Sequence, residues 1–232
     1  MRDAHGTDVR PEASLVTRGA RNRSAHDAPD EVLRRVLDHF ALPKLSDAVP
    51  NDVLTRFGLV RPTQYGVACR DVKRACAEAE RLGAGPFVVA TIDAVGWRER
   101  GVRVPGCRLD VGLGFVGNTQ IEFLGPGRRT RFYSDALDGA DARLHHAGIY
   151  QRGVESLGAH LVAAGHPEAV RGGLHLGAAL SFDFRYYDTR DALGIYLEVL
   201  DFRVLDRPLI MDPFIRVGAR VAALGRPARS TG

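Results

Sequence analysis

Four side chains able to bind a metal ion occupy matching places in two similar stretches of the chain. Residues 64–72 read Gln-Tyr-Gly-Val-Ala-Cys-Arg-Asp-Val, and residues 146–154 read His-Ala-Gly-Ile-Tyr-Gln-Arg-Gly-Val. Aligning Gln64 with His146 also aligns a glycine, an arginine and a valine, and each stretch is later followed by a glutamate in an apolar run, Glu122 or Glu198. This internal repeat indicates one metal site shared by two half-domains.

The ligand types restrict the metal. Amide and carboxylate oxygens with one imidazole suit Zn²⁺, Ni²⁺, Co²⁺, Mn²⁺ or Fe²⁺, and the absence of a thiolate argues against a closed structural zinc site. Taken singly, a glutamate in an apolar strand commonly lies on the solvent face, and an isolated histidine is commonly a surface residue. The equivalent positions of all four residues in the repeat favour the metal site.

Such a site could promote proton transfer. A carbonyl polarised by a metal has a more acidic α-hydrogen, and a carboxylate beside the metal can take that proton and return it elsewhere. Either Glu198 or Glu122 could be this group.

The expected elements can bring these residues together. Alternate residues of a strand share a face, so one inward-pointing side chain from each of four strands could converge on a cleft. If Glu122 and Glu198 point into the cleft, their apolar neighbours, such as Ile121 and Leu197, point into the opposite layer.

The pattern divides the chain into five segments. Residues 1–28 are polar and aperiodic and are expected to form a disordered tail, followed by an N-terminal helical extension over 29–61, with an apolar stripe at helical spacing in residues 33–40. Two βαβββ modules are expected over 62–140 and 141–205, and a C-terminal helix and tail over 206–232, with helical spacing from residue 208 to 224.

The strand and helix patterns repeat between the modules. The first predicts a strand at 65–69, a helix at 71–82 and strands at 88–92, 108–116 and 120–124. The second predicts a strand at 147–150, a helix at 154–164 and strands near 169, at 174–184 and at 196–200. One such module leaves a sheet face and an edge uncovered, so the two modules are expected to pair, within one chain or across a dimer. The fold class is therefore α+β.

Composition excludes several classes of protein. The 232 residues carry a formal net charge of +4, but no basic stripe interleaved with aromatics, which argues against nucleic-acid binding. No apolar run reaches the roughly 18 residues that span a bilayer, and the N-terminus lacks a secretory pattern. Three cysteines without a CxxC pair fit a reducing compartment. We therefore predict a cytoplasmic protein that binds neither membranes nor nucleic acid.

Several motifs together resemble the vicinal oxygen chelate superfamily, which includes glyoxalase I, methylmalonyl-CoA epimerase, extradiol dioxygenases and the fosfomycin- and bleomycin-resistance proteins. They cover about residues 62–202: Gln-Tyr-Gly-Val from 64, Gly-Ala-Gly-Pro-Phe from 83, Gln-Ile-Glu-Phe-Leu from 120, Leu-His-His-Ala-Gly from 144 and Leu-Gly-Ile-Tyr-Leu-Glu from 193. The resemblance is greatest to glyoxalase I-like and methylmalonyl-CoA epimerase-like members.

The resemblance implies two tandem βαβββ modules that form curled sheets around a metal-binding cleft. It places the divalent metal on Gln64, Glu122, His146 and Glu198, with Glu198 as the favoured base and Glu122 facing it. The implied activity is that of an isomerase, epimerase or lyase on a small molecule with vicinal oxygens, in a possible homodimer.

Two alternatives stay open. An Fe(II) extradiol-type dioxygenase resembles the chain less, because Gln64 replaces one of the two histidines that bind iron in those members. A non-enzymatic binding or resistance protein would use the cleft to hold a small molecule. Near the site, His145 is expected on the opposite side of its strand from His146, as a residue that supports the site or has a structural role. The arginines around Trp97 are expected in a solvated hairpin.

Overall fold

We analysed a computed structural model of the chain. It describes residues 28–58, 62–150, 154–176, 180–205, 207–209, 213, 216–218, 220 and 221. The predicted tail therefore lies, apart from residue 28, outside the described residues.

The first module contains every element that its sequence pattern predicts. These are β1 (Gln64–Cys69), α4 (Val72–Arg81), β2 (Val88–Asp93), β5 (Arg108–Val116) and β6 (Thr119–Leu124). Helix α4 begins where the side chain of Asp71 accepts a hydrogen bond from the backbone N–H of Arg74, which is a standard N-cap. The predicted hairpin forms β3 (Val95–Glu99) and β4 (Val102–Arg103), inserted between β2 and β5.

The second module follows the same order with one correction. Its elements are β7 (Ala142–Tyr150), α5 (Val154–Ala163), β8 (Glu168–Leu176), β9 (Leu180–Tyr187) and β10 (Tyr196–Val204). The single strand predicted over 174–184 is wrong, because this stretch contains the end of β8 and the start of β9, which pair antiparallel. A short 3-10 helix, η1 (Asp135–Leu137), lies between the modules, and α6 (Arg190–Leu193) precedes β10.

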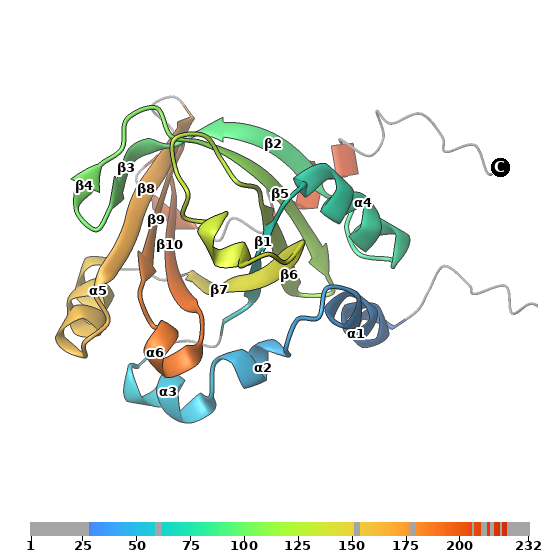
Figure 1. The fold of residues 1–232 in the computed structure, drawn as a ribbon, viewed down its shortest axis with the longest axis horizontal. Coiled ribbons are helices and arrows are strands. Elements are labelled where there is room, and N and C mark those ends of the chain that lie inside the picture. Colours follow the sequence, from blue (N-terminus) through green and yellow to red (C-terminus); the bar gives the residue numbers. More distant parts are fainter. Residues whose placement is uncertain are drawn as a thin grey trace, which may run out of the picture.

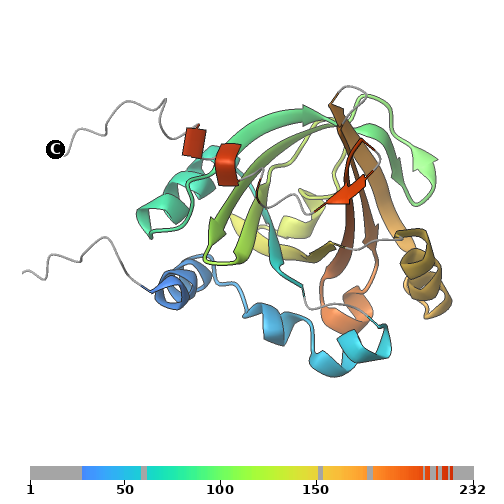
Figure 2. The same ribbon diagram turned by 180° about the vertical axis from the view of Figure 1, so that it is seen from behind.

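The two modules pair as related halves of one curled sheet (Figures 1 and 2). The strand order is β2-β5-β6-β1 in the first half and β7-β10-β9-β8 in the second, so each half places its first strand at the centre. There β1 pairs antiparallel with β7, while β1 with β6 and β7 with β10 are parallel. The predicted α+β fold of two βαβββ modules is confirmed, with both modules in one continuous sheet.

The inserted hairpin connects the two ends of this sheet. Strand β2 lies at one end, yet β3, which follows after Ala94, pairs with β8 at the other end. The sheet therefore curls until its outer strands are joined by consecutive residues of the chain (Figure 1). Trp97 of β3 is only 1% exposed and packs beside Phe184 of β9. The hairpin thus belongs to the wall of the interior.

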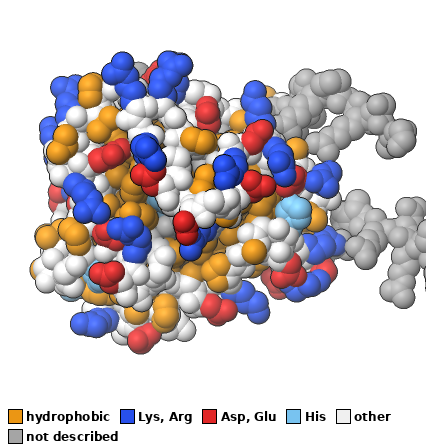
Figure 3. Space-filling model, in the orientation of Figure 1, with side chains coloured by type: hydrophobic (Ala, Val, Ile, Leu, Met, Phe, Trp, Pro, Cys, Tyr) orange, Lys and Arg blue, Asp and Glu red, His pale blue; other side chains and the backbone are white. Residues whose placement is uncertain are grey.

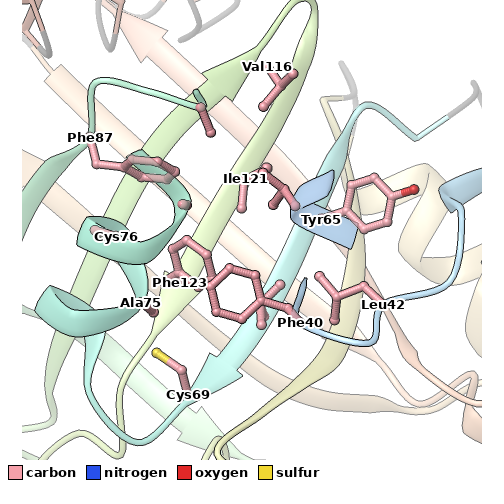
Figure 4. Close-up of a cluster of buried hydrophobic side chains, with 14 of the residues drawn as sticks. Phe40, Leu42, Tyr65, Cys69, Ala75, Cys76, Phe87, Val116, Ile121 and Phe123 are labelled. Atoms are coloured by element: carbon pink, nitrogen blue, oxygen red, sulfur yellow. The ribbon is translucent and has the colours of Figure 1, made fainter. Parts of the chain in front are cut away.

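Helices cover the outer face of the sheet. Helix α1 (Pro29–His39), predicted from its apolar spacing, buries Val36 and Leu37 together with α4 against β1 and β6. Figure 4 shows this layer, in which the rings of Phe40 and Phe123 lie 5.1 Å apart. Helices α2 (Leu45–Ala48), α3 (Asn51–Arg56) and α5 contribute to a second outer cluster with Leu197 and Val199.

The C-terminal prediction needs correction. Residues 207–209 form β11 (Arg207–Leu209), which pairs with β10, instead of beginning a helix. Residues 216–218, 220 and 221 are helical, but Val217 and Val221, expected on a buried stripe, are 60% and 63% exposed. The other predicted stripe positions, 210, 214 and 224, lie outside the described residues.

Charged side chains are dispersed over the surface, as the absence of a basic stripe in the sequence predicts. Basic and acidic side chains are interspersed over the face in Figure 3, with apolar side chains between them. In the part of the chain that the structure describes, no helix combines the length and apolar character needed to cross a bilayer. None of the three cysteines forms a disulfide, and all three are buried.

Candidate metal centre

The four predicted ligands lie on the four central strands of the sheet, in two neighbouring rows. In one row, Glu122 of β6 and His146 of β7 both lie opposite Gly66 of β1. In the other row, Gln64 of β1 and Glu198 of β10 both lie opposite Gly148 of β7. The repeat seen in the sequence is therefore a structural symmetry about the β1–β7 pair.

Two glycines create the space for the ligands. A Cβ atom on Gly66 would lie 1.8 Å from Cε1 of His146, and one on Gly148 would lie 1.9 Å from Oε1 of Gln64. Real Cβ atoms do not approach other atoms so closely. Each module thus provides a glycine over which the other module's ligand lies, which explains why the repeat aligns these glycines.

The ligand atoms converge. Nε2 of His146 lies 3.0 Å from Oε2 of Glu198 and 3.3 Å from Oε2 of Glu122. Among the described residues, these three form a group whose ligand atoms lie within 4.8 Å of one another. Gln64 adjoins them, because its Nε2 donates a hydrogen bond of 3.1 Å to Oε2 of Glu122.

The hydrogen bonding of this cluster fits a metal ion. Nε2 of His146, Oε2 of Glu198 and Oε1 of Gln64 are buried and make no hydrogen bond of normal geometry. Buried polar atoms are nearly always satisfied, so three such atoms in one place indicate a missing partner. A divalent cation would satisfy imidazole and carboxylate groups together, and rotation of the Gln64 amide would turn its oxygen toward Glu122. The residues fit the metal that the sequence predicts.

The predicted orientation of His145 is wrong, whereas its contact with His146 agrees with the supporting or structural role predicted for it. The pairing of β1 with β7 shifts register between Gly66 and Val67, so Gly66 faces His146 whereas Val67 faces Leu144. His145 is the extra residue of a β-bulge, which breaks the alternation of side chains. Its Nδ1 consequently lies 3.1 Å from Nδ1 of His146.

The contact between His145 and His146 determines which of their ring nitrogens carry protons. Burial, followed by the neighbouring His146, lowers the pKa of His145 well below its usual value, although the Phe132 backbone acts in the opposite direction. A neutral His145 can accept a hydrogen bond from the Nδ1–H group of His146, which leaves Nε2 of His146 free to bind a metal. Such outer partners commonly fix the tautomer of a histidine ligand.

The carboxylates alter the protonation of the site. Burial lowers the pKa of His146, but Glu198 and Glu122 together outweigh it and raise the pKa to about 9. Burial raises the pKa of Glu122, Glu198 raises it further, and His146 opposes the shift. Without a metal, a proton on His146 therefore stabilises the two adjacent carboxylates.

Two tyrosines missing from the sequence prediction complete the centre. Tyr186 of β9 pairs across the sheet with Glu198, and its ring lies 5.0 Å from the ring of His146. Tyr133, in the connection between modules, donates a hydrogen bond of 3.1 Å to the Tyr186 hydroxyl. Burial, followed by the charge of Glu198, raises the pKa of both tyrosines well above the usual value, so both remain protonated. Neither lies in the sequence repeat, so no motif could identify them.

We predict that metal binding releases a proton. Because the pKa of His146 is about 9 without metal, Nε2 carries a proton at pH 7.5 and must lose it to bind a cation. Below pH 9 the affinity for Zn²⁺ should then rise with pH by about tenfold per unit for a single competing proton. Isothermal titration calorimetry in buffers of different ionisation enthalpy measures this release.

The exposed His160 provides a matched control. The His160→Gln variant should release as many protons as the unmodified protein. Binding at pH 7.5 without proton release would contradict the proposed state of His146.

Solved structures align with about 60% of this chain at low sequence identity. A methylmalonyl-CoA epimerase from Mycobacterium tuberculosis is 16% identical with a TM-score of 0.40, over 60% of this chain and 85% of the epimerase. A Streptomyces coelicolor methylmalonyl-CoA epimerase, in complex with 2-nitronate-propionyl-CoA, is 15% identical with a TM-score of 0.41, over 60% and 94%. A hypothetical protein from Bacillus halodurans is 13% identical with a TM-score of 0.40, over 60% and 91%.

No family model matches the sequence. No curated protein matches it either.

Proposed function

We propose that the protein is a metal-dependent enzyme that transfers a proton at a carbon next to a carbonyl, in an isomerisation, epimerisation or elimination. Its substrate would be a small molecule with two neighbouring oxygens, as the resemblance to the vicinal oxygen chelate superfamily implies. The observation that carries the proposal is the convergence of Glu122, His146 and Glu198, two of which, the glutamates, line a cavity inside the curled sheet.

The same residues would hold the metal. His146 offers Nε2, the two glutamates offer carboxylate oxygens, and Gln64 offers its amide oxygen after rotation. A bound divalent ion would act as a Lewis acid, polarising the substrate carbonyl and thereby acidifying the adjacent C–H group.

Glu198 is the better placed of the two carboxylates to take the proton. It lines the cavity, and its Oε2 accepts no hydrogen bond, whereas Oε2 of Glu122 accepts one from Gln64. Tyr186, opposite Glu198 in the sheet, lines the cavity beside it. Glu122 lines the same cavity and could return a proton from a second direction. Glu198 is buried and Glu122 is partly buried, which limits the access of bulk water to the transfer.

Exchange of substrate hydrogen for solvent deuterium tests this function. We expect protein loaded with Zn²⁺, Ni²⁺, Co²⁺ or Mn²⁺ to incorporate deuterium into at least one class among α-hydroxy ketones, hemithioacetals and 2-substituted acyl thioesters. Mass spectrometry measures the incorporation, and chelator-treated protein is the control. Tight binding of such molecules by metal-free protein, without exchange in any class, would instead favour a binding or resistance protein.

A further inference from the structure

The cavity that contains the candidate metal centre has mostly apolar walls. It measures about 160 Å³ and is lined by side chains from both modules. Among its polar lining residues, Gln64, Glu122 and Glu198 lie together at the metal centre, and the others, Tyr133, Ser181 and Tyr186, carry only uncharged hydroxyl groups. The remaining wall is formed largely by aliphatic and aromatic side chains, among them Val88, Ala90, Ile92, Leu113, Phe182 and Phe184.

The charged side chains of this wall are all acidic. Of the described residues that line the cavity, only Glu122 and Glu198 are charged, and both belong to the metal centre. The arginines of the β3–β4 hairpin, Arg98, Arg100 and Arg103, do not line it. An anionic substrate group inside the cavity would therefore lose its hydration without gaining a basic partner, which is unfavourable.

We infer that the part of the substrate beyond its two chelating oxygens is uncharged and apolar, such as a single aromatic ring or a short branched aliphatic group. This inference rests on the proposed function, because it assumes that the oxygens bind the metal. The size agrees, since an apolar cavity of about 150 Å³ accommodates benzene. A carboxylate- or phosphate-bearing group does not fit this chemistry within the cavity.

Hydroxamic acids test the inference, because they chelate metals through two neighbouring oxygens. The probes are acetohydroxamate, benzohydroxamate and 4-carboxybenzohydroxamate, added to Zn²⁺-loaded or chelator-treated protein. Trp97 is the only tryptophan and contacts Phe184 of the cavity wall, so its fluorescence reports binding, and calorimetry gives the affinity. We expect benzohydroxamate to bind at least about 30-fold more tightly than acetohydroxamate, because its ring leaves water for an apolar wall.

The carboxylated probe should bind at least about 30-fold more weakly than benzohydroxamate, because its second charge would be desolvated.

Two variants test whether the missing basic partner causes this weaker binding. Ala90 lines the cavity and is exposed, so it lies at the rim. Ala90→Arg should strengthen binding of the carboxylated probe at least about tenfold by supplying a partner for its charge. The matched control is Thr91→Arg, because Thr91 is the next residue of β2, does not line the cavity and should leave all affinities unchanged.

The outcomes distinguish a failure of this inference from a failure of the proposed function on which it rests. Metal-dependent binding of all three probes with equal affinity would overturn the apolar substrate class while leaving the metal centre in place. Failure of every probe to bind the Zn²⁺-loaded protein would overturn the chelating site, and the inference with it.

Discussion

Replacing Glu198 by Gln should reduce metal-dependent deuterium exchange by about 100- to 10 000-fold, the contribution typical of a general base. Glutamine keeps the size and one carbonyl oxygen of the side chain but cannot accept the substrate proton. Because His146 and Glu122 remain, the metal should still bind when supplied in excess. Exchange is measured by mass spectrometry at saturating metal, and metal content by atomic emission.

A matched control is Glu155→Gln, which changes an exposed glutamate of α5 that pairs with Arg185. This variant should exchange deuterium at the original rate. Exchange by Glu198→Gln within tenfold of the original rate, with metal bound, would remove Glu198 from the role of base. Glu122 would then be the remaining carboxylate in the cavity.

The sequence predicts the ligands because strand alternation and the internal repeat are local properties. Apolar residues on either side of Glu122 and Glu198 indicate strands with one polar position, and the structure buries those neighbours in outer clusters. The order of the βαβββ elements follows from periodicity and glycine positions in the same way. Convergence of the residues on one site follows from the symmetry of the two modules.

The remaining features depend on contacts between distant residues. The bulge at His145 arises from the register of β7 against β1, which no local pattern specifies. The pairing of β3 with β8 joins strands far apart in sequence, so the hairpin is predictable but its place in the sheet is not. Tyr133 and Tyr186 lie at the site because of how the strands and the connection between the modules are arranged in space, and no sequence pattern links them to the ligands. The lining of the cavity likewise becomes visible only when strands from both modules are assembled.

Substituting Gly66 by alanine should nearly abolish metal binding although no ligand is changed. The added Cβ would lie 1.8 to 2.2 Å from three atoms of the His146 imidazole, so the ring must leave its position. We expect the affinity for Zn²⁺ to fall by at least about 100-fold, the upper end of the cost of disturbing a group that orients a ligand. Calorimetry measures the affinity, and His146→Ala provides the comparison for full loss of the ligand.

Gly114→Ala separates this effect from general destabilisation. Gly114 also lies in a strand, and its added Cβ would lie 2.6 Å from Phe87 in the outer layer, away from the metal centre. Both alanine variants should lose about 1–3 kcal/mol of stability through overpacking. Urea unfolding of the metal-free proteins measures that loss. Only Gly66→Ala should also lose the metal, because only its new methyl group displaces a ligand; equal Zn²⁺ affinity in the two variants would show that His146 does not bind the metal from its position over Gly66.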